Sequence, residues 1–198
     1  MSHSRLTGLY AITDRALMQD ALLEHAQQAL AGGVRIIQYR DKSADAKRRH
    51  EEATALRRLC QQHQALLIIN DDIELALEVD ADGVHIGQKD TSLASARERL
   101  GNEKIIGISC NNRFDLAQEA QRGGANYIAF GRFYPSASKP DAPQAELLLL
   151  EKARQQLSLP VVAIGGITLA NAQPLLEAGA DMLAVIQGLF NQPDIQRT

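Results

Sequence analysis

Tryptophan is absent from this sequence, and aromatic residues make up only 4% of it. Proteins that bind nucleic acid use aromatic side chains to stack bases and usually carry a clear excess of basic residues. This chain has no such excess, because 24 acidic residues outnumber 21 lysines and arginines and give a net charge of −3. No apolar run approaches the length of a membrane-spanning helix. We therefore expect neither a nucleic acid nor a membrane as a partner.

Cysteine is also scarce. Cys60 and Cys110 are the two cysteines of the chain, and their wide separation matches no metal-ligand spacing. Reduced thiols and a cytoplasmic location are the natural interpretation. The first seven residues contain no apolar stretch typical of a signal peptide, and we expect residues 1–7 to form a short flexible N-terminus ahead of one domain that spans residues 1–198.

The sequence does contain short apolar runs that alternate with helical patterns, without a linker between halves. We expect strands near residues 8–13, 35–40, 66–70, 83–87, 104–109, 127–131, 160–165 and 182–186. Helices are expected near residues 20–31, 44–63, 73–79, 92–100, 114–122, 144–157, 169–178 and 188–191. This alternation indicates an α/β fold with parallel strands, either a closed (β/α)8 TIM barrel or an open doubly wound sheet.

A repeated helix-to-strand joint favours the barrel. Ala31-Gly-Gly-Val, Arg122-Gly-Gly-Ala and Ala178-Gly-Ala-Asp each end a predicted helix and enter a predicted strand, and Val79-Asp-Ala-Asp resembles them. Glycine suits a helix C-terminus because it adopts a left-handed conformation without steric cost. In a barrel these joints form the face that supports stability, and the opposite face, at the carboxyl ends of the strands, carries function.

Polar residues gather where the predicted strands end. Asn70 and Asp71 follow one strand, and Asp90 follows the next. Magnesium is typically held by one or two carboxylates together with waters and substrate phosphates, so Asp71 and Asp90 are candidate Mg²⁺ ligands. The alternative is that Asp71 or Asp72 caps the following helix and that Asp90 caps the helix near Ser92.

Two further groups could bind phosphate. Gln38, Arg40 and Lys42 alternate along an extended segment, so they would point to one side and suit a diphosphate. The alternative for Arg40 and Lys42 is a pair of surface ion pairs. Elsewhere the loop 135–140, with two serines and Lys139, could hold an anion, as could Gly165-Gly166 at a helix start. A solvated turn and a tight strand-to-helix turn are the alternatives.

Nucleophilic catalysis finds no support in the sequence. His85 lies in the middle of a predicted strand, where a packed histidine with satisfied hydrogen bonds is the expected state. Nothing near Cys110 marks it as a nucleophile, and no nucleophile elbow accompanies a Ser-His-Asp set.

Taken together, these motifs resemble the thiamine-phosphate synthase family. The resemblance covers nearly the whole chain in order, and its stretches are Tyr10 to Asp14, Gln38 to Lys42, Asn70-Asp71, Gly83 to Asp90, Ile106 to Ser109, Gly131 to Pro140, Ala163 to Ile167 and Ala184 to Ile186. It implies a (β/α)8 barrel and a transferase that joins an aminomethylpyrimidine diphosphate to a thiazole phosphate. The products are thiamine phosphate and pyrophosphate.

The resemblance also implies roles for individual residues. Asp71 and Asp90 would hold Mg²⁺, and Arg40 and Lys139 would act in catalysis by neutralising the departing pyrophosphate. The pyrimidine diphosphate would be bound by Gln38, Tyr39, Arg40, Asp41, Lys42, Asn70, Ser109 and Lys139. The thiazole phosphate would be bound by Ser136, Ala137, Ser138 and Gly166. No protein nucleophile is needed, because the aminopyrimidine stabilises the cation that forms before the thiazole nitrogen adds.

Some positions depart from the family pattern. Ser136 and Ser138 stand where threonines are common, Gln187 where a serine is usual, and Arg132 where a proline is common. Three alternatives remain open: a thiazole tautomerase on the same barrel, a barrel that only binds a thiamine precursor, and a phosphosugar isomerase. Gln88 and Asp90 argue against the tautomerase, and the isomerase would need an acid–base pair that the sequence does not reveal. A homo-oligomer is compatible with the sequence.

Overall fold

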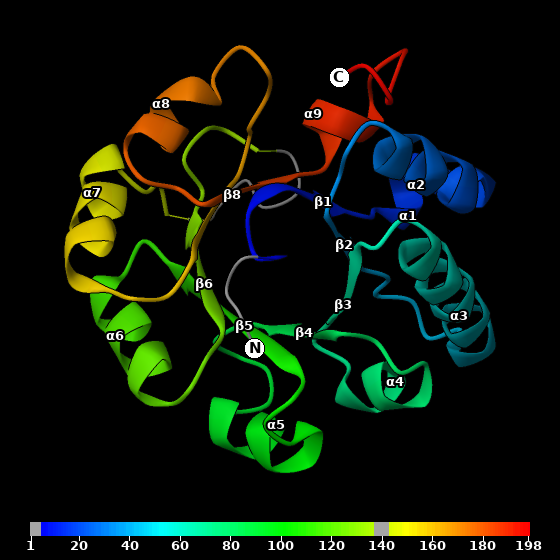
Figure 1. Ribbon diagram of the computed structural model, residues 1–198, viewed down its shortest axis with the longest axis horizontal. Helices are drawn as coiled ribbons and strands as arrows, with labels where there is room; N and C mark the ends of the chain where they lie inside the picture. Colours follow the sequence, from blue (N-terminus) through cyan, green and yellow to red (C-terminus); the bar gives the residue numbers. More distant parts are fainter. Residues whose placement is uncertain (1–4, 137–142) are drawn as a thin grey trace.

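Eight parallel strands close into a barrel in the order of the chain (Figure 1). The structure is a computed structural model that describes residues 5–136 and 143–198. Its strands are β1 (Gly8–Ile12), β2 (Ile36–Tyr39), β3 (Leu66–Asn70), β4 (Gly83–Ile86), β5 (Ile105–Asn111), β6 (Tyr127–Gly131), β7 (Val161–Ile164) and β8 (Met182–Val185). Because β8 pairs with β1, the sheet has no free edge, and the expected (β/α)8 barrel is confirmed over the open sheet.

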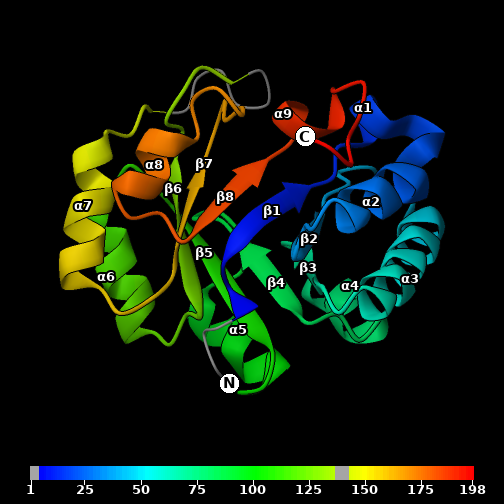
Figure 2. The same cartoon turned by 45° about the horizontal axis from the view of Figure 1, so that its top comes forward.

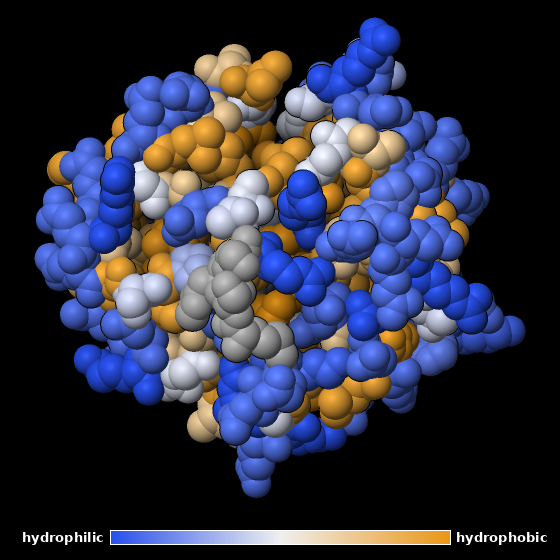
Figure 3. Space-filling model, viewed as in Figure 1, coloured by the Kyte–Doolittle hydropathy of each residue, from blue (hydrophilic) through white to orange (hydrophobic). Residues whose placement is uncertain are grey.

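Helices surround the barrel and return the chain from each strand to the next (Figure 2). They are α1 (Arg15–Met18), the 3-10 turn η2 (Gln19–Ala21), α2 (Leu22–Ala31), α3 (Ala46–Gln62), α4 (Ile73–Glu78), α5 (Leu93–Leu100), α6 (Phe114–Arg122), α7 (Leu147–Gln156), α8 (Gln173–Glu177) and α9 (Gln187–Phe190). Around the rim of the molecule, where these helices lie, the surface is mostly hydrophilic (Figure 3). Within the described ranges, no helix is long and apolar enough to cross a membrane.

Successive side chains of each strand point to opposite sides of the barrel wall. One set packs outward against the helices and includes Ile37, Leu67 and Val84. The other fills the barrel and includes Ile36, Ile68 and Val162. Leu6 belongs to this inner cluster and is only 5% exposed, whereas its neighbours Arg5 and Thr7 are exposed.

The helix-to-strand joints behave as their sequence repeat predicts. Gly33, Gly124 and Gly179 have φ values of 101°, 82° and 109°, and the related joint places Asp80 at 52°. Three of these positions are glycine, which adopts this conformation without a Cβ penalty.

The boundaries of some helices differ from the prediction. The sequence patterns did not reveal α1, which begins because the Asp14 side chain accepts hydrogen bonds from the backbone N–H groups of Ala16 and Leu17. The helix expected over 169–178 is shorter, because a turn at Thr168 to Asn171 precedes α8 and is closed by the Asn171 side chain.

Candidate active site

The carboxyl ends of the strands gather the polar residues that the sequence singles out. The arrows of β1, β7 and β8 point toward this end of the barrel (Figure 2). Gln38 lies in β2, Asn70 ends β3 and Ser109 lies in β5, while Arg40 and Asp71 directly follow β2 and β3. In a TIM barrel this end is the catalytic face.

Arg40 and Lys42 lie beyond the end of β2 and reach toward different neighbours. The backbone N–H of Arg40 donates to Thr13 Oγ1 at 2.9 Å, and its guanidinium lies 3.8 Å from the Asp14 carboxylate. Lys42 instead contacts Asp71, across toward β3. The two cations therefore contact carboxylates that follow the strands on either side of β2, and their shared role in binding a diphosphate stays a prediction.

Asp71 connects the expected phosphate site with the expected metal site. Its Oδ2 receives hydrogen bonds from Lys42 Nζ and, at 2.8 Å, from Asn70 Nδ2. The backbone of Asp71 has a φ of 54°, and its N–H donates to the His85 carbonyl of β4 at 2.9 Å. The adjacent Asp72 caps α4 by accepting from the Leu75 N–H, so the capping alternative applies to Asp72 and not to Asp71.

Asp90 also has a role other than helix capping. Its Oδ2 accepts a 2.8 Å hydrogen bond from the Gly87 N–H, which folds the turn after β4, and Ser92 caps α5 instead. Among the described residues, no group of three or more His, Cys, Asp or Glu side chains is placed to hold a metal. Two carboxylates that follow adjacent strands fit Mg²⁺, because this ion completes its octahedral shell with waters and substrate phosphates.

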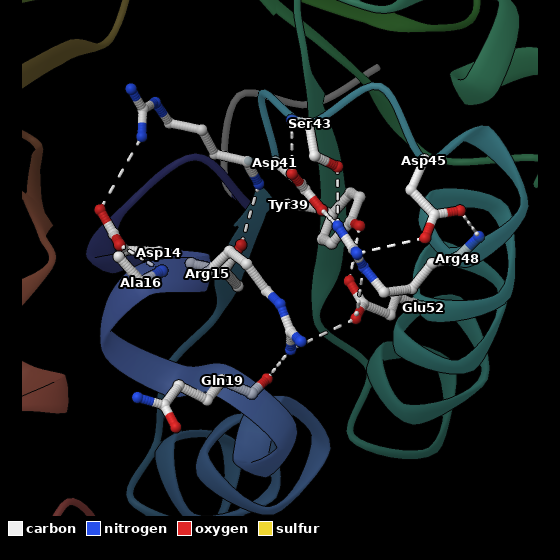
Figure 4. Close-up of polar contacts among 12 residues, drawn as sticks. Asp14, Arg15, Ala16, Gln19, Tyr39, Asp41, Ser43, Asp45, Arg48 and Glu52 are labelled. Atoms are coloured by element: carbon white, nitrogen blue, oxygen red, sulfur yellow. Dashed lines mark hydrogen bonds and ion pairs between the residues drawn. The ribbon is translucent and has the colours of Figure 1, made fainter.

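Two predicted substrate-binding residues have side chains that face away from the barrel interior. The hydroxyl of Tyr39 donates to Glu52 of α3 at 2.7 Å, on the helix side of β2 (Figure 4). Asp41 receives hydrogen bonds of 2.7 Å from both Arg48 and the Ser43 N–H. Strand alternation turns Tyr39 outward, and both side chains anchor the loop that carries Arg40 and Lys42. That Tyr39 and Asp41 bind substrate stays a prediction.

The hydrogen bonds of Asp41 with Arg48 and Ser43, which anchor the loop, stabilise the ionised form of the Asp41 carboxyl. Burial favours the neutral acid, but the hydrogen bonds from Arg48 and Ser43 outweigh it and lower the pKa of Asp41. Arg48 also contacts Asp45 and Glu52, at 3.3 and 3.5 Å. The loop is therefore held by a guanidinium that several carboxylates share, as Figure 4 shows.

A hydrogen-bonded chain that the sequence did not reveal crosses the barrel interior. Gln38 donates to the Tyr10 hydroxyl at 2.8 Å, and the Tyr10 and Tyr127 hydroxyls are 2.8 Å apart. His85 then lies 3.0 Å from the Tyr127 hydroxyl and 2.9 Å from Ser109 Oγ. The expectation of a packed histidine with satisfied hydrogen bonds is confirmed. Tyr127 lies in the inner cluster, so the inward parity of its strand was the signal that could have identified it.

The loops after β6 and β7 are joined beside the expected phosphate site. The Tyr134 N–H donates to the Gly165 carbonyl at 3.0 Å, and a Cβ at Gly166 would lie 2.3 Å from the Pro135 carbonyl oxygen. With φ values of 105° and 64°, Gly165 and Gly166 make a tight turn that only glycine accommodates readily. Ser136 is half-buried, whereas Ala137, Ser138 and Lys139 lie outside the described residues.

The geometry defines a class of protein: a TIM-barrel enzyme whose catalytic face combines basic side chains, carboxylates and a glycine turn of the kind that binds phosphate. The family model for thiamine monophosphate synthase matches residues 9–189. The chain therefore belongs to the thiamine monophosphate synthase family.

Individual relatives agree with this assignment. The thiamine-phosphate synthase of Thioalkalivibrio sulfidiphilus is 55% identical over 96% of this chain and 90% of its own length, and that of Thiobacillus denitrificans is 51% identical over the same shares. The solved thiamine phosphate pyrophosphorylase of Pyrococcus furiosus superposes with a TM-score of 0.90 at 36% identity, covering 98% of this chain and 92% of that one. The expectation that the chain is a biosynthetic transferase is confirmed.

Proposed function

We propose that this protein is a Mg²⁺-dependent thiamine-phosphate synthase that joins a pyrimidine diphosphate to a thiazole phosphate. Family membership supports the reaction. The structural observation that supports it most is the contact between Lys42 and Asp71, which brings a candidate diphosphate cation onto a candidate metal ligand. A diphosphate–Mg²⁺ pair matches both groups, because phosphate oxygens take the ammonium and the ion takes the carboxylate.

In the proposed reaction, the C–O bond between the pyrimidine methylene and the diphosphate breaks, and the thiazole nitrogen forms a C–N bond to that methylene. The electron pair of the broken bond leaves with pyrophosphate. Arg40 and Lys42 bind the diphosphate oxygens and stabilise the charge that develops on them. Bound Mg²⁺, held by Asp71 and Asp90, would add Lewis-acid neutralisation of the same leaving group.

The remaining residues orient the reactants. Gln38, Asn70 and Ser109 bind the pyrimidine diphosphate from the ends of β2, β3 and β5. We assign the thiazole phosphate to the loop of Ser136, Ala137 and Ser138 and to the turn at Gly166, with Lys139 completing the diphosphate contacts. Positioning the two reactants together supplies much of the rate, since it removes the entropy cost of their encounter.

The experiment mixes the purified protein with both substrates and Mg²⁺ and measures thiamine phosphate. Formation of product that requires both substrates supports the proposal. A folded protein that only isomerises the thiazole, or that binds without turnover, contradicts it in favour of the tautomerase or the binding barrel. Asp90→Asn should lower the rate and weaken the response to Mg²⁺, whereas Asp80→Asn, on the opposite face beside Lys104, serves as the matched control.

The proposal also covers the cellular location and the oligomeric state of the protein. Cys60 and Cys110 are both free and buried, which accords with a reducing, cytoplasmic setting. A homo-oligomer stays a prediction, and light scattering of the purified protein tests it.

A further inference from the structure

Five side chains from five strands form the hydrogen-bonded chain inside the barrel. They are Gln38, Tyr10, Tyr127, His85 and Ser109, joined by contacts of 2.8 to 3.0 Å. Tyr10, Tyr127 and Gln38 are at most 3% exposed. A buried polar network of this kind has to satisfy each of its donors and acceptors, because an unpaired polar group away from water is costly.

Both phenols keep their protons in this setting. Burial raises the pKa of Tyr10 far above its ordinary value, although hydrogen bonds with Tyr127 and Gln38 act in the opposite direction. Burial likewise raises the pKa of Tyr127 well above that of a free tyrosine. Each hydroxyl therefore has one proton to give and can accept one or two others.

The amide of Gln38 gives the chain a direction. Its nitrogen can only donate, so the Tyr10 hydroxyl accepts from it. The proton of Tyr10 is then left to donate to the Tyr127 hydroxyl, 2.8 Å away. If the same direction continues, the Tyr127 hydroxyl donates to His85 Nδ1, which lies 3.0 Å away. A neutral imidazole that accepts at Nδ1 carries its proton on Nε2, and this proton faces Ser109 Oγ.

We infer that Tyr10 and Tyr127 are positioning residues that hold His85 in the Nε2-protonated tautomer and thereby present Ser109 as a hydrogen-bond donor to the pyrimidine diphosphate. Ser109 accepts from His85, so its single proton stays available for an anionic ligand. This role rests on the proposed function. At the other end of the hydrogen-bonded chain, the Gln38 nitrogen donates to Tyr10. Its side-chain carbonyl oxygen is then the atom that can accept a hydrogen bond from the substrate.

The packing around Tyr127 shows how the sequence makes room for this chain. Gly107 of β5 lies in register between His85 of β4 and Tyr127 of β6. A Cβ at Gly107 would lie 1.9 Å from Tyr127 Cζ, so only glycine admits the ring. The His85 ring stacks on Tyr127, with centroids 5.6 Å apart and planes 23° from parallel. The imidazole is therefore fixed by packing as well as by hydrogen bonds.

The hydrogen bonds of the chain could also run in the opposite direction, and this alternative makes the inference testable. If the Gln38 amide were turned over, Tyr10 would donate to it and every proton along the chain would reverse. His85 would then be protonated at Nδ1, and Ser109 would donate to the imidazole and not to the ligand. Each direction satisfies the whole network, but the two place the imidazole proton on different nitrogens.

The tautomer can be read by ¹⁵N NMR of the histidine ring nitrogens in the full chain at a pH where the imidazole is neutral. His85→Gln identifies the signals among the five histidines. We expect protonation at Nε2 in the native protein and a mixture of tautomers in Tyr127→Phe, with Tyr10→Phe as the second variant. Protonation at Nδ1 in the native protein, or an unchanged tautomer in these variants, overturns the inference.

A control separates this effect from general loss of packing. Val162→Ala removes apolar bulk from the same inner cluster but changes none of the five residues of the hydrogen-bonded chain. We expect the native tautomer in this variant. A tautomer that changes there as it does in Tyr127→Phe would show that it follows packing in general, and would overturn the inference.

A double-mutant cycle tests whether Tyr127 acts through Ser109. We expect Tyr127→Phe and Ser109→Ala each to lower kcat/KM for the pyrimidine diphosphate by roughly tenfold to a hundredfold, the usual effect of a lost hydrogen bond to a charged group. The double variant should be no worse than Ser109→Ala. Losses that multiply would overturn the inference. If the native protein makes no thiamine phosphate, the proposed function fails while the tautomer measurement still decides the proton positions.

Discussion

The ammonium of Lys42 contacts Oδ2 of Asp71, the same oxygen to which the Asn70 amide donates. This contact joins the loop after β2 to the end of β3 across the catalytic face. The contact balances the negative charge of the Asp71 carboxylate, a proposed Mg²⁺ ligand. It also balances the positive charge of the Lys42 ammonium, which we propose binds the diphosphate. Binding of a diphosphate with its Mg²⁺ would exchange one opposite charge for another on both residues, so the site stays neutralised throughout.

Asp71→Asn tests this relationship. Because the variant removes the charge that Lys42 contacts and that Mg²⁺ would bind, we expect a loss of roughly a hundredfold in kcat/KM. The Lys42 side chain is 56% exposed, so stability should change by less than about 1 kcal/mol. Steady-state kinetics and urea unfolding measure the two effects. Asp72→Asn is the control, since asparagine also caps a helix; equal activity losses in both variants would argue against a special role for Asp71.

Lys139→Ala tests the division of the loop after β6, a prediction that comes from the sequence because this residue lies outside the described ranges. We expect KM for the pyrimidine diphosphate to rise about tenfold or more, since one cation on the leaving group is lost. KM for the thiazole phosphate should change little. Substrate titrations of the variant measure both constants, and equal effects on them would show that the division is wrong.

Asp41→Asn tests the anchor behind the loop that carries Arg40. The folded protein lowers the pKa of this carboxyl, so its contribution to stability is complete above the unfolded value of about 3.9 and disappears as the pH falls through the folded value. Loss of the charge-assisted hydrogen bond from Arg48 should destabilise the variant by about 1.5 to 3 kcal/mol at pH 7.

Urea unfolding of this variant at pH 7 and again below pH 4 measures the difference. The gap between native and variant proteins should shrink at the lower pH. Asp20→Asn is the control, because that carboxylate is 98% exposed and should matter little at either pH. A gap that stays constant with pH would refute the ionic role of Asp41.

Gly107→Ala tests the space reserved for Tyr127. The added methyl group would overlap the phenol ring, and overpacking of this kind costs about 1 to 3 kcal/mol or more. Chemical unfolding measures this cost. Gly123→Ala is the control: its Cβ would meet the end of a flexible leucine, Leu93, at 2.7 Å, and this neighbour can move aside. A tolerated alanine at position 107 would show that the ring is not confined.

The barrel was predictable because nearly every strand and helix has its own local pattern in the sequence. Short apolar runs gave all eight strands to within two residues or so, and the repeated joints around Gly33, Gly124 and Gly179 revealed the common unit. Among the helices of the described residues, α1 alone was not predicted, because a single Asp14 cap starts a helix too short for a periodic pattern.

The positions of the candidate site residues were more predictable than the contacts between them. Asn70, Asp71 and Ser109 lie at the strand ends as expected. Tyr39 and Asp41 share a motif with Arg40, but their side chains bond to Glu52 and Arg48 of α3, residues that the motif does not contain. The chain through Tyr10, Tyr127 and His85 depends on contacts between strands far apart in sequence, which no local pattern encodes.

The most direct measurement follows the reaction of pyrimidine diphosphate with thiazole phosphate by ³¹P NMR, in the presence of Mg²⁺ and again in EDTA. The account predicts that pyrophosphate and thiamine phosphate appear together in equal amounts with Mg²⁺, and that both fail to appear in EDTA. Product formation that EDTA leaves unchanged, or pyrophosphate released without thiamine phosphate, would contradict a Mg²⁺-dependent synthase.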